Sequence, residues 1–246
     1  MTSLLRAEGV SAFYGASQIL FEIDLALDEK RTLALLGRNG AGKSTTMKTL
    51  AGIVPARSGR IFFADRDITH APPHARAKLG LAYVPEDRQV QGAVLPLGLR
   101  ENTTLASLAK HARAGFLSRR SELAEVRRLG TRLSVKAAHW DQKLQELSGG
   151  NQQKVVIAKW LATNPKVIIL DEPTKGIDVG SKAAVHDFMV ELAGEGLAIV
   201  LISSELPEVM GMSDRILVMH EGRIVREFAR AEMDAAGIVT AATGGH

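Results

Sequence analysis

Short apolar runs alternate with polar, glycine-containing turns in the first third of the chain and again in its last third. Residues 4–10 and 19–27 alternate apolar and polar positions, with a turn at Tyr14-Gly15 between them, as in half-buried antiparallel strands. Residues 33–36, 81–84 and 167–170 are apolar throughout, which is typical of parallel strands buried on both faces. Residues 58–64 add a strand and 73–79 a short helix. The pattern predicts an α/β fold with an antiparallel β portion near the N-terminus.

The pattern changes between about residues 87 and 146. Charges are frequent there, strand signals are few, and residues 101–109 and 118–133 follow the helical period. We therefore expect a single domain over 1–246, with a core at about 1–86 and 147–230 and a helical subdomain at about 87–146. A further helical stripe should face the core, at Ala184, Val185, Phe188, Met189 and Leu192.

Composition excludes several classes of protein. With 246 residues, 46% of them hydrophobic, the chain can bury a sizeable core, and the absence of cysteine removes disulfides, thiolate catalysis and Cys-zinc sites. The longest apolar run, residues 197–202, falls far short of the roughly 20 residues that span a bilayer, so any membrane link is expected through a partner. The net charge of +4 owes much to one cluster, Lys110, Arg113, Arg119, Arg120, Arg127, Arg128 and Arg132. This cluster is read as a solvated helix face, with a surface for anionic lipid or a partner as the alternative.

One loop between an apolar strand and a helix carries a phosphate-binding pattern. It fits G-x-x-x-x-G-K-[ST], and the residues expected to bind nucleotide are Gly37, Arg38, Asn39, Gly40, Ala41, Gly42, Lys43, Ser44 and Thr45. Glycines let backbone N–H groups turn toward phosphate oxygens, and the helix, expected to open at Thr45, adds the positive end of its dipole. Lys43 can reach the β- and γ-phosphates, and the Ser44 hydroxyl can bind Mg²⁺.

Two carboxylates follow the apolar strand 167–170. Because ligands of α/β folds bind at the carboxyl ends of strands, Asp171 is expected to hold Mg²⁺ and Glu172 to orient and deprotonate an attacking water. A second anion-ready helix start lies at Ser148, Gly149 and Gly150. It suggests a contact with nucleotide held by another copy, although an ordinary helix cap is an equal alternative. Tyr14 could stack on adenine or be a surface aromatic.

These motifs together resemble the ATP-binding cassette ATPases over nearly the whole chain. GRNGAGKS corresponds to Walker A, LSGGNQQ to the signature, VIILDE to Walker B, and GID ending at Asp178 to the D-loop. The resemblance implies a P-loop NTPase fold of ABC type, with a mostly parallel core sheet, an antiparallel β subdomain and a helical subdomain. It also implies ATP and Mg²⁺ as ligands, with two cassettes paired head to tail and ATP between Walker A and the partner's signature. Tyr14 then falls at the position that stacks on adenine.

The resemblance further implies how such a chain works in a cell. It would act at the cytoplasmic face of the membrane as a peripheral protein, bound to integral permease subunits and serving a solute-binding protein indirectly, with no nucleic-acid partner. From about residue 90 onward the chain resembles the C-terminal cassettes of ribose and other simple-sugar importers. The first eighty or so residues look more like branched-chain amino-acid importer cassettes. A natural hybrid and an engineered fusion are both compatible with this mixture.

Two positions depart from the general cassette pattern. Glu86 stands where most members have a glutamine, and Ser204 stands at the position of the switch histidine. A glutamate can accept a hydrogen bond from metal-bound water but cannot donate, and a serine donates over a shorter reach without charge. Glu86 is expected at the metal and Ser204 among the catalytic residues with Lys43 and Glu172.

The sequence thus favours an ATP-hydrolysing importer subunit with sugar as cargo. The alternatives are a branched-chain amino-acid importer and a regulatory cassette of slow turnover. A cassette of translation or DNA repair would need a second cassette or a long coiled coil. Several residues are read as structural or surface rather than metal-binding or base-stacking: His70, His74, His111, His139, His186, His220, Trp140 and Trp160.

Overall fold

The computed structural model describes residues 3–245, which divide into two units of dense internal contact. The first unit comprises residues 3–83, 166–172 and 189–245, and the second comprises 84–165 and 173–188. Residues 147–165, which the sequence pattern assigns to the core, lie in the second unit, as do residues 173–188. We describe each unit by itself.

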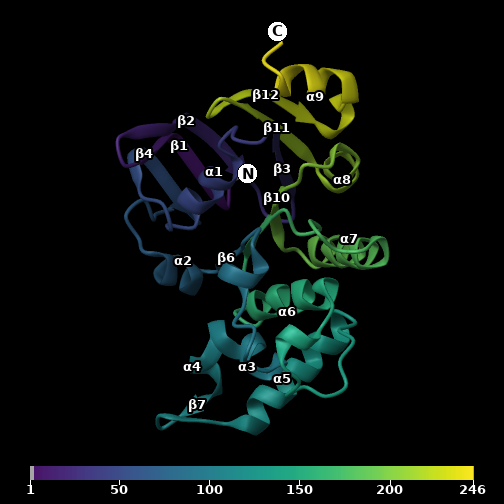
Figure 1. The fold of residues 1–246 in the computed structure, drawn as a ribbon. Coiled ribbons are helices and arrows are strands. Elements are labelled where there is room, and N and C mark those ends of the chain that lie inside the picture. Colours follow the sequence, from purple (N-terminus) through teal and green to yellow (C-terminus); the bar gives the residue numbers. More distant parts are fainter. Residues whose placement is uncertain (1–2, 246) are drawn as a thin grey trace. The chain divides into compact units, whose positions relative to one another are not determined.

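The N-terminal part of the first unit is an antiparallel sheet with the strand order β2-β1-β4-β5 (Figure 1). Its strands are β1 (Leu5–Tyr14), β2 (Ser17–Leu27), β4 (Ala56–Phe63) and β5 (Arg66–Asp67). The two long strands that the alternating pattern predicts are therefore present, and Leu5 pairs with Leu27 at one end and Tyr14 with Ser17 at the other. The apolar side chains of this sheet pack into the main core with Leu20, Ile23 and Ile61, all fully buried.

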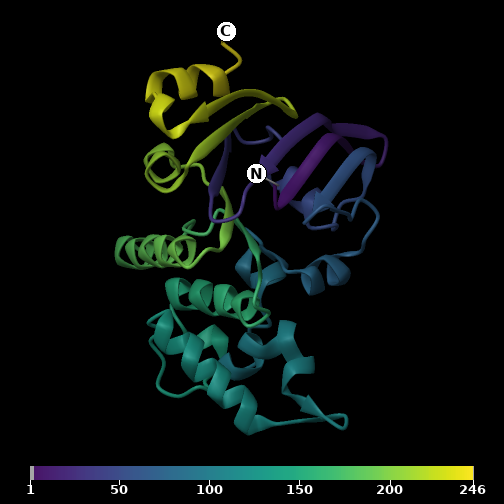
Figure 2. The same cartoon turned by 180° about the vertical axis from the view of Figure 1, so that it is seen from behind.

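The second sheet of this unit carries the strands that end at the candidate site. Its order is β12-β11-β3-β10-β9-β6, with β3 (Thr32–Gly37), β6 (Leu81–Val84), β9 (Val167–Asp171), β10 (Ala198–Ile202), β11 (Arg215–His220) and β12 (Arg223–Ala229). Strand β10 pairs in parallel with both β3 and β9, which aligns their carboxyl ends. The unit's helical segments are α1 (Lys43–Leu50), α2 (Pro73–Leu79), α8 (Leu206–Met212), η4 (Arg230–Glu232) and α9 (Ala235–Ala242). Helix α9 packs on β11 and β12, as Figures 1 and 2 both show.

The second unit is mainly helical. It contains η1 (Arg88–Gly92), α3 (Leu99–Thr104), η2 (Leu105–Ser107), α4 (Leu108–His111), β7 (Ala112–Arg113), β8 (Phe116–Leu117), α5 (Arg119–Arg132), η3 (Leu144–Glu146) and α6 (Gly149–Leu161). Helices α3, α5 and α6 pack on one another around a small core of Leu99, Val126, Leu144 and Val155. Helix α7 (Val179–Gly194) begins in this unit and ends in the first.

The helix expected over residues 101–109 is broken into α3, η2 and α4. Two hydroxyls near the break bond to backbone carbonyls: Thr104 Oγ1 donates to Arg100 O at 3.0 Å and Ser107 Oγ to Thr104 O at 3.2 Å. Such bonds compete with regular helix geometry. The short hairpin β7–β8 is a second feature that the helical pattern did not predict.

The apolar stripe predicted on α7 is largely buried. Val185, Phe188, Met189 and Leu192 are each at most 5% exposed, and Ala184 is half-buried. Among the helices of residues 3–245, none combines the length and the apolarity needed to cross a membrane.

Lys159 on α6, in the second unit, predicts how the free energy of unfolding depends on pH. Burial lowers the pKa of its amine from 10.5 to about 8, and Nζ donates to Gly92 O at 2.6 Å. The unfolded chain therefore holds this proton to a higher pH than the folded chain, so the cost of burying the charge is present below about pH 8 and is lost as the pH rises toward 10.5. In this pH window we expect the free energy of unfolding of the wild type to rise with pH. The rise should be steeper than that of Lys159→Met, which lacks the amine, by up to about 1 kcal/mol per pH unit. Urea denaturation at several pH values measures the difference, and parallel curves would contradict the assignment.

Candidate functional site

The phosphate-binding loop connects β3 to α1 in the first unit. Gly40 and Gly42 have positive φ angles of 83° and 100°, which residues with a Cβ rarely adopt. A Cβ on Gly37 would lie 2.3 Å from the carbonyl oxygen of Met219 on β11, so this position also excludes larger residues. Helix α1 begins at Lys43, two residues before the expected Thr45, and this brings the dipole end of the helix closer to the loop.

The donors of this loop are arranged for an anion. Lys43 is buried, and its Nζ donates to Gly37 O at 2.7 Å and to Arg38 O at 3.1 Å, so the ammonium lies across the loop. Gly42 precedes α1 without any side-chain cap, and the first turn of the helix contains no acidic residue. The N–H groups of that turn are therefore available to an anion without a competing side-chain acceptor. Arg38 and Asn39 are exposed at the loop surface, whereas Ala41 is buried.

Ser44 and Asp171 meet at the end of β9. Ser44 Oγ donates to Asp171 Oδ1 at 3.1 Å, and Tyr83 Oη on β6 donates to Asp171 Oδ2 at 3.0 Å. Asp171 is 1% exposed, so the two hydrogen bonds fix both oxygens of a buried carboxylate. One hydroxyl and one carboxylate fit Mg²⁺, which takes few protein oxygens and fills its remaining positions with water and phosphate. Within residues 3–245 there is no group of three or more His, Cys, Asp or Glu side chains that could hold a metal.

Glu172 and Ser204 are held together by the strand register. Because Ile202 on β10 pairs with Asp171 on β9, the residues that follow these strands are neighbours. Glu172 Oε2 accepts hydrogen bonds from both the backbone N and the Oγ of Ser204, each at 3.1 Å. Glu172 also has a positive φ of 49°, which is uncommon for a residue with a side chain. Such backbone conformations cluster at functional sites.

Tyr14 lies at the end of β1, where the strand turns through Gly15 into β2. Its side chain is 49% exposed. The ring is accessible to a base, and its stacking on adenine stays a prediction.

The predicted signature and D-loop residues come together in the second unit. Ser148 caps α6, and its Oγ accepts from Asn151 Nδ2 at 2.9 Å. Asp178 accepts from Ser181 N at 2.9 Å and from Ser181 Oγ at 2.7 Å, and these bonds lower the pKa of its carboxyl. A Cβ on Gly150 would lie 2.1 Å from Ser181 Oγ, so α6 and the start of α7 approach closely only because this residue is glycine.

Glu86 has a cation partner within the second unit. Lys175 Nζ lies 2.6 Å from Glu86 Oε1, and both side chains are largely exposed. Arg88, which follows shortly after Glu86 in the sequence, donates to Lys175 O at 3.1 Å and to Gly176 O at 3.3 Å. The segment that begins at Glu86 is thus tied to the segment that leads to Asp178. Binding of Mg²⁺ by Glu86 stays a prediction.

Two supports of the first unit's site were not predicted from the sequence. Tyr83 carries a phenolic hydroxyl within an otherwise apolar buried strand, and a buried tyrosine hydroxyl usually needs a partner, which was the available signal. The turn between β11 and β12 supports the phosphate-binding loop through the hydrogen bond from Gly222 N to Ala41 O at 3.0 Å. No local sequence pattern indicates this long-range contact.

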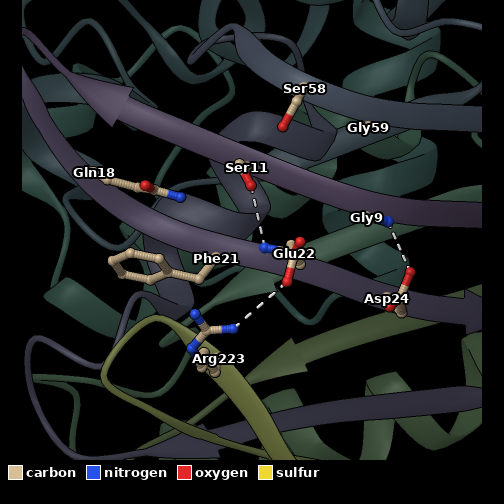
Figure 3. Close-up of a pocket in the computed structure, with 9 residues that line it drawn as sticks. All are labelled: Gly9, Ser11, Gln18, Phe21, Glu22, Asp24, Ser58, Gly59 and Arg223. Carbon is tan, nitrogen blue, oxygen red and sulfur yellow. Dashed lines mark hydrogen bonds and ion pairs between the residues drawn. The ribbon is translucent and has the colours of Figure 1, made fainter.

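A polar hollow on the antiparallel sheet lies among residues outside the predicted site (Figure 3). Its polar groups bond to one another: Asp24 accepts from Gly9 N at 2.7 Å, and Ser11 Oγ accepts from Glu22 N at 3.2 Å. Arg223 lies 3.8 Å from Glu22 and over the ring of Phe21. These contacts account for the hollow as part of the packing of the antiparallel sheet against β12.

Comparison with known protein families matches residues 20–175 to the family described as ABC transporter. Among curated proteins, the ribose import ATP-binding protein RbsA 3 of Rhizobium etli is 51% identical over 91% of this chain and 44% of its own length. The ribose import ATP-binding protein RbsA of Jannaschia sp. is 50% identical over 98% of this chain and 46% of its own length. The chain thus spans about half the length of these relatives. The relative from Jannaschia sp. aligns with the first eighty residues of this chain as well as with the remainder.

Solved structures give the same result at the level of the fold. A nucleotide-free ATP-binding cassette from an ABC transporter matches with a TM-score of 0.79 at 25% identity, over 93% of this chain and 92% of that one. An ATP-binding subunit of an ABC transporter matches with a TM-score of 0.79 at 26% identity, over 98% of this chain and 100% of that one. These matches confirm the fold class predicted from the sequence.

Proposed function

The chain belongs to the ABC transporter family, and from this premise we propose that it binds ATP and hydrolyses it to ADP and phosphate. The observation that carries the proposal is the first unit's arrangement of three groups at the ends of neighbouring strands. Lys43 lies across a glycine-rich loop, Ser44 bonds to Asp171, and Glu172 bonds to Ser204. Their chemistry matches the phosphates, the metal and the attacking water of phosphoryl transfer.

The proposed mechanism assigns one task to each group. The loop N–H groups and Lys43 hold the β- and γ-phosphates, and Ser44 and Asp171 would hold Mg²⁺, which neutralises phosphate charge when bound. Glu172 accepts a hydrogen bond from water and takes its proton as the water oxygen bonds to the γ-phosphorus. The bond from that phosphorus to the ADP oxygen breaks at the same time. Ser204 holds the Glu172 carboxylate in place through its two donors.

A second copy, or another cassette, completes the proposed site. Ser148, Gly149 and Gly150 form the start of α6, where the two glycines leave the backbone N–H groups without side chains of their own, and Asp178 lies beside Gly150. This helix start would offer donors to a phosphate held by a partner. Tyr14 would stack on the adenine and Glu86 would contact metal-bound water after release from Lys175. Each of these roles is part of the proposal.

We further propose that the chain energises uptake of a sugar through integral permease subunits, at the cytoplasmic face of the membrane, with a solute-binding protein upstream. The relatives named for ribose import support sugar over branched-chain amino acids as cargo. A regulatory cassette of slow turnover is the second candidate. It is favoured by one observation, which is the serine at position 204 in place of a charged or longer donor.

Lys43→Ala tests nucleotide binding. The change removes the cation that faces the phosphates, and we expect ATP affinity to fall by about 10- to 100-fold, the equivalent of roughly 1.4–2.8 kcal/mol. Lys48→Ala is the matched control because Lys48 lies in the last turn of the same helix. Isothermal titration calorimetry with Mg-ATP measures both. Equal affinities in the two variants would contradict the proposal.

A second measurement separates the transporter subunit from the slow regulatory cassette. It compares the steady-state ATPase rate of the chain with and without a permease.

A further inference from the structure

The hairpin β7–β8 presents apolar side chains to solvent at one end of the second unit. Figures 1 and 2 show it at the end of that unit far from α6. Its two tip residues, Ala114 and Gly115, have positive φ angles of 51° and 84°, as in the tight turns that match the twist of a hairpin. Phe116 is 80% exposed and Leu117 is 52% exposed. The hairpin thus exposes two large apolar side chains that are adjacent in the sequence, and grouped exposed apolar side chains rimmed by polar residues mark interaction surfaces.

Cations surround this apolar tip. Residues 110–128 contain six lysines and arginines and only two carboxylates. Both carboxylates are already paired: Glu122 is buried and lies 2.8 Å from Arg100, and Glu125 lies 2.8 Å from Arg128. Nearby, Arg119 is paired with Asp141 at 2.7 Å.

Three arginines of this segment keep their charge available. Arg113, Arg120 and Arg127 are exposed, and none has an ion-pair partner within the part of the chain that the structure describes. Arg113 is the cross-strand partner of Phe116, so the cation and the ring lie on the same face of the hairpin.

The other two arginines extend the same surface along α5. Arg120 and Arg127 are seven residues apart, so they lie on one face of the helix, with the exposed Ala124 between them. The residues of the opposite face, Val126 and Leu129, are buried. The unpaired charges therefore point away from the core of the unit.

We propose that this surface, consisting of Arg113, Phe116, Leu117, Arg120 and Arg127, contacts an anionic lipid bilayer. The combination matches the two layers of a membrane interface, because an aromatic ring suits the boundary between headgroups and acyl chains while arginines suit lipid phosphates. Nucleic acid fits less well, since binding of single strands uses several stacking rings and Phe116 is the only aromatic residue of residues 112–132. The proposal goes beyond the nucleotide chemistry: the chain would touch the bilayer itself, in addition to any permease.

The expected strength follows from the charges. Each arginine near an anionic surface contributes a factor of roughly five in affinity, so three contribute roughly 100-fold. The attraction falls with ionic strength, because charges farther apart than the Debye length of about 10 Å at 0.1 M salt are screened.

The test is co-sedimentation of the full chain with vesicles. Phosphatidylcholine vesicles containing about one third phosphatidylglycerol are compared with pure phosphatidylcholine, at about 0.05 M and 0.5 M salt. We expect binding to the anionic vesicles at low salt only, and a loss of roughly 100-fold in Arg113→Gln/Arg120→Gln/Arg127→Gln. The matched control, Arg60→Gln/Arg66→Gln/Lys78→Gln, removes three exposed cations from the first unit. Equal losses in both triple variants, or equal binding to the two vesicle types, would overturn the proposal.

A separate measurement tests whether the Phe116 ring enters the bilayer. Phe116→Ser should weaken binding at unchanged charge. When anionic vesicles are added, the emission of Phe116→Trp should shift to shorter wavelength relative to the wild type, whose Trp140 and Trp160 supply the background. An unshifted emission together with unchanged binding of Phe116→Ser would show that the ring does not enter the bilayer and would overturn its assignment. ATPase activity of all variants without lipid reports on the proposed function separately: vesicle binding without hydrolysis would leave the membrane contact standing, whereas hydrolysis without vesicle binding would remove it.

Discussion

Glu172→Gln should bind ATP normally and hydrolyse it about 10²- to 10⁴-fold more slowly than the wild type, which is the range for loss of a positioned general base. The amide keeps the size of the side chain and can still accept hydrogen bonds from Ser204 N and Oγ through its oxygen. It cannot take a proton from water. The change should therefore lower kcat and leave ATP affinity nearly unchanged.

The same variant should accumulate an ATP-bound dimer. If ATP joins two cassettes and hydrolysis separates them, a protein that binds without hydrolysing remains paired. Size-exclusion chromatography with saturating Mg-ATP measures this state, and single-turnover kinetics measure the chemical step. Glu205→Gln is a suitable control because it changes an exposed carboxylate close by in the sequence. Wild-type turnover in Glu172→Gln would refute the assignment of the base.

Local sequence patterns predicted the structure of the candidate site where a single segment carries both the reactive groups and the backbone that positions them. The loop from Gly37 to Ser44 contains its own glycines, its cation and its hydroxyl, so the local pattern is sufficient. The apolar run that ends at Asp171 similarly places a carboxylate at the end of a strand. Local patterns also predicted β6 and α2 with the bounds that the structure has.

Features that depend on distant segments could not be predicted in the same way. The hydrogen bond from Tyr83 to Asp171 joins residues 88 positions apart, and the close approach of Gly37 to Met219 joins two neighbouring strands. The grouping of α6 with the helical unit depends on its packing against α3 and α5, which periodicity alone does not reveal. The exposed hairpin could not be predicted for a different reason. Its strands contain two residues each, which is shorter than the length that a periodic pattern needs.

Ser204 combines a sequence-based expectation with a long-range contact. The family resemblance puts it at the position of the switch histidine, and the structure shows its hydroxyl donating to Glu172. A hydroxyl that orients the general base should matter to chemistry and not to binding. We expect Ser204→Ala, which keeps the backbone donor and loses the Oγ donor, to lower kcat by about tenfold. In the Glu172→Gln background the same change should have little further effect, since residues that act as a unit are not additive.

Ser204→His completes the test of this position. An imidazole N–H can replace the hydroxyl as a donor to Glu172 and is long enough to approach the charge that develops on the phosphate, where a donor is worth on the order of 10²–10³ in rate. We expect kcat to rise, by less than this full factor, because the ring needs a neighbour that fixes its tautomer. ATP affinity should stay nearly unchanged, since the gain occurs in the transition state. Steady-state ATPase at matched protein concentration measures both variants. A histidine variant that is folded, binds ATP and turns over no faster than the wild type would show that Ser204 does not limit hydrolysis.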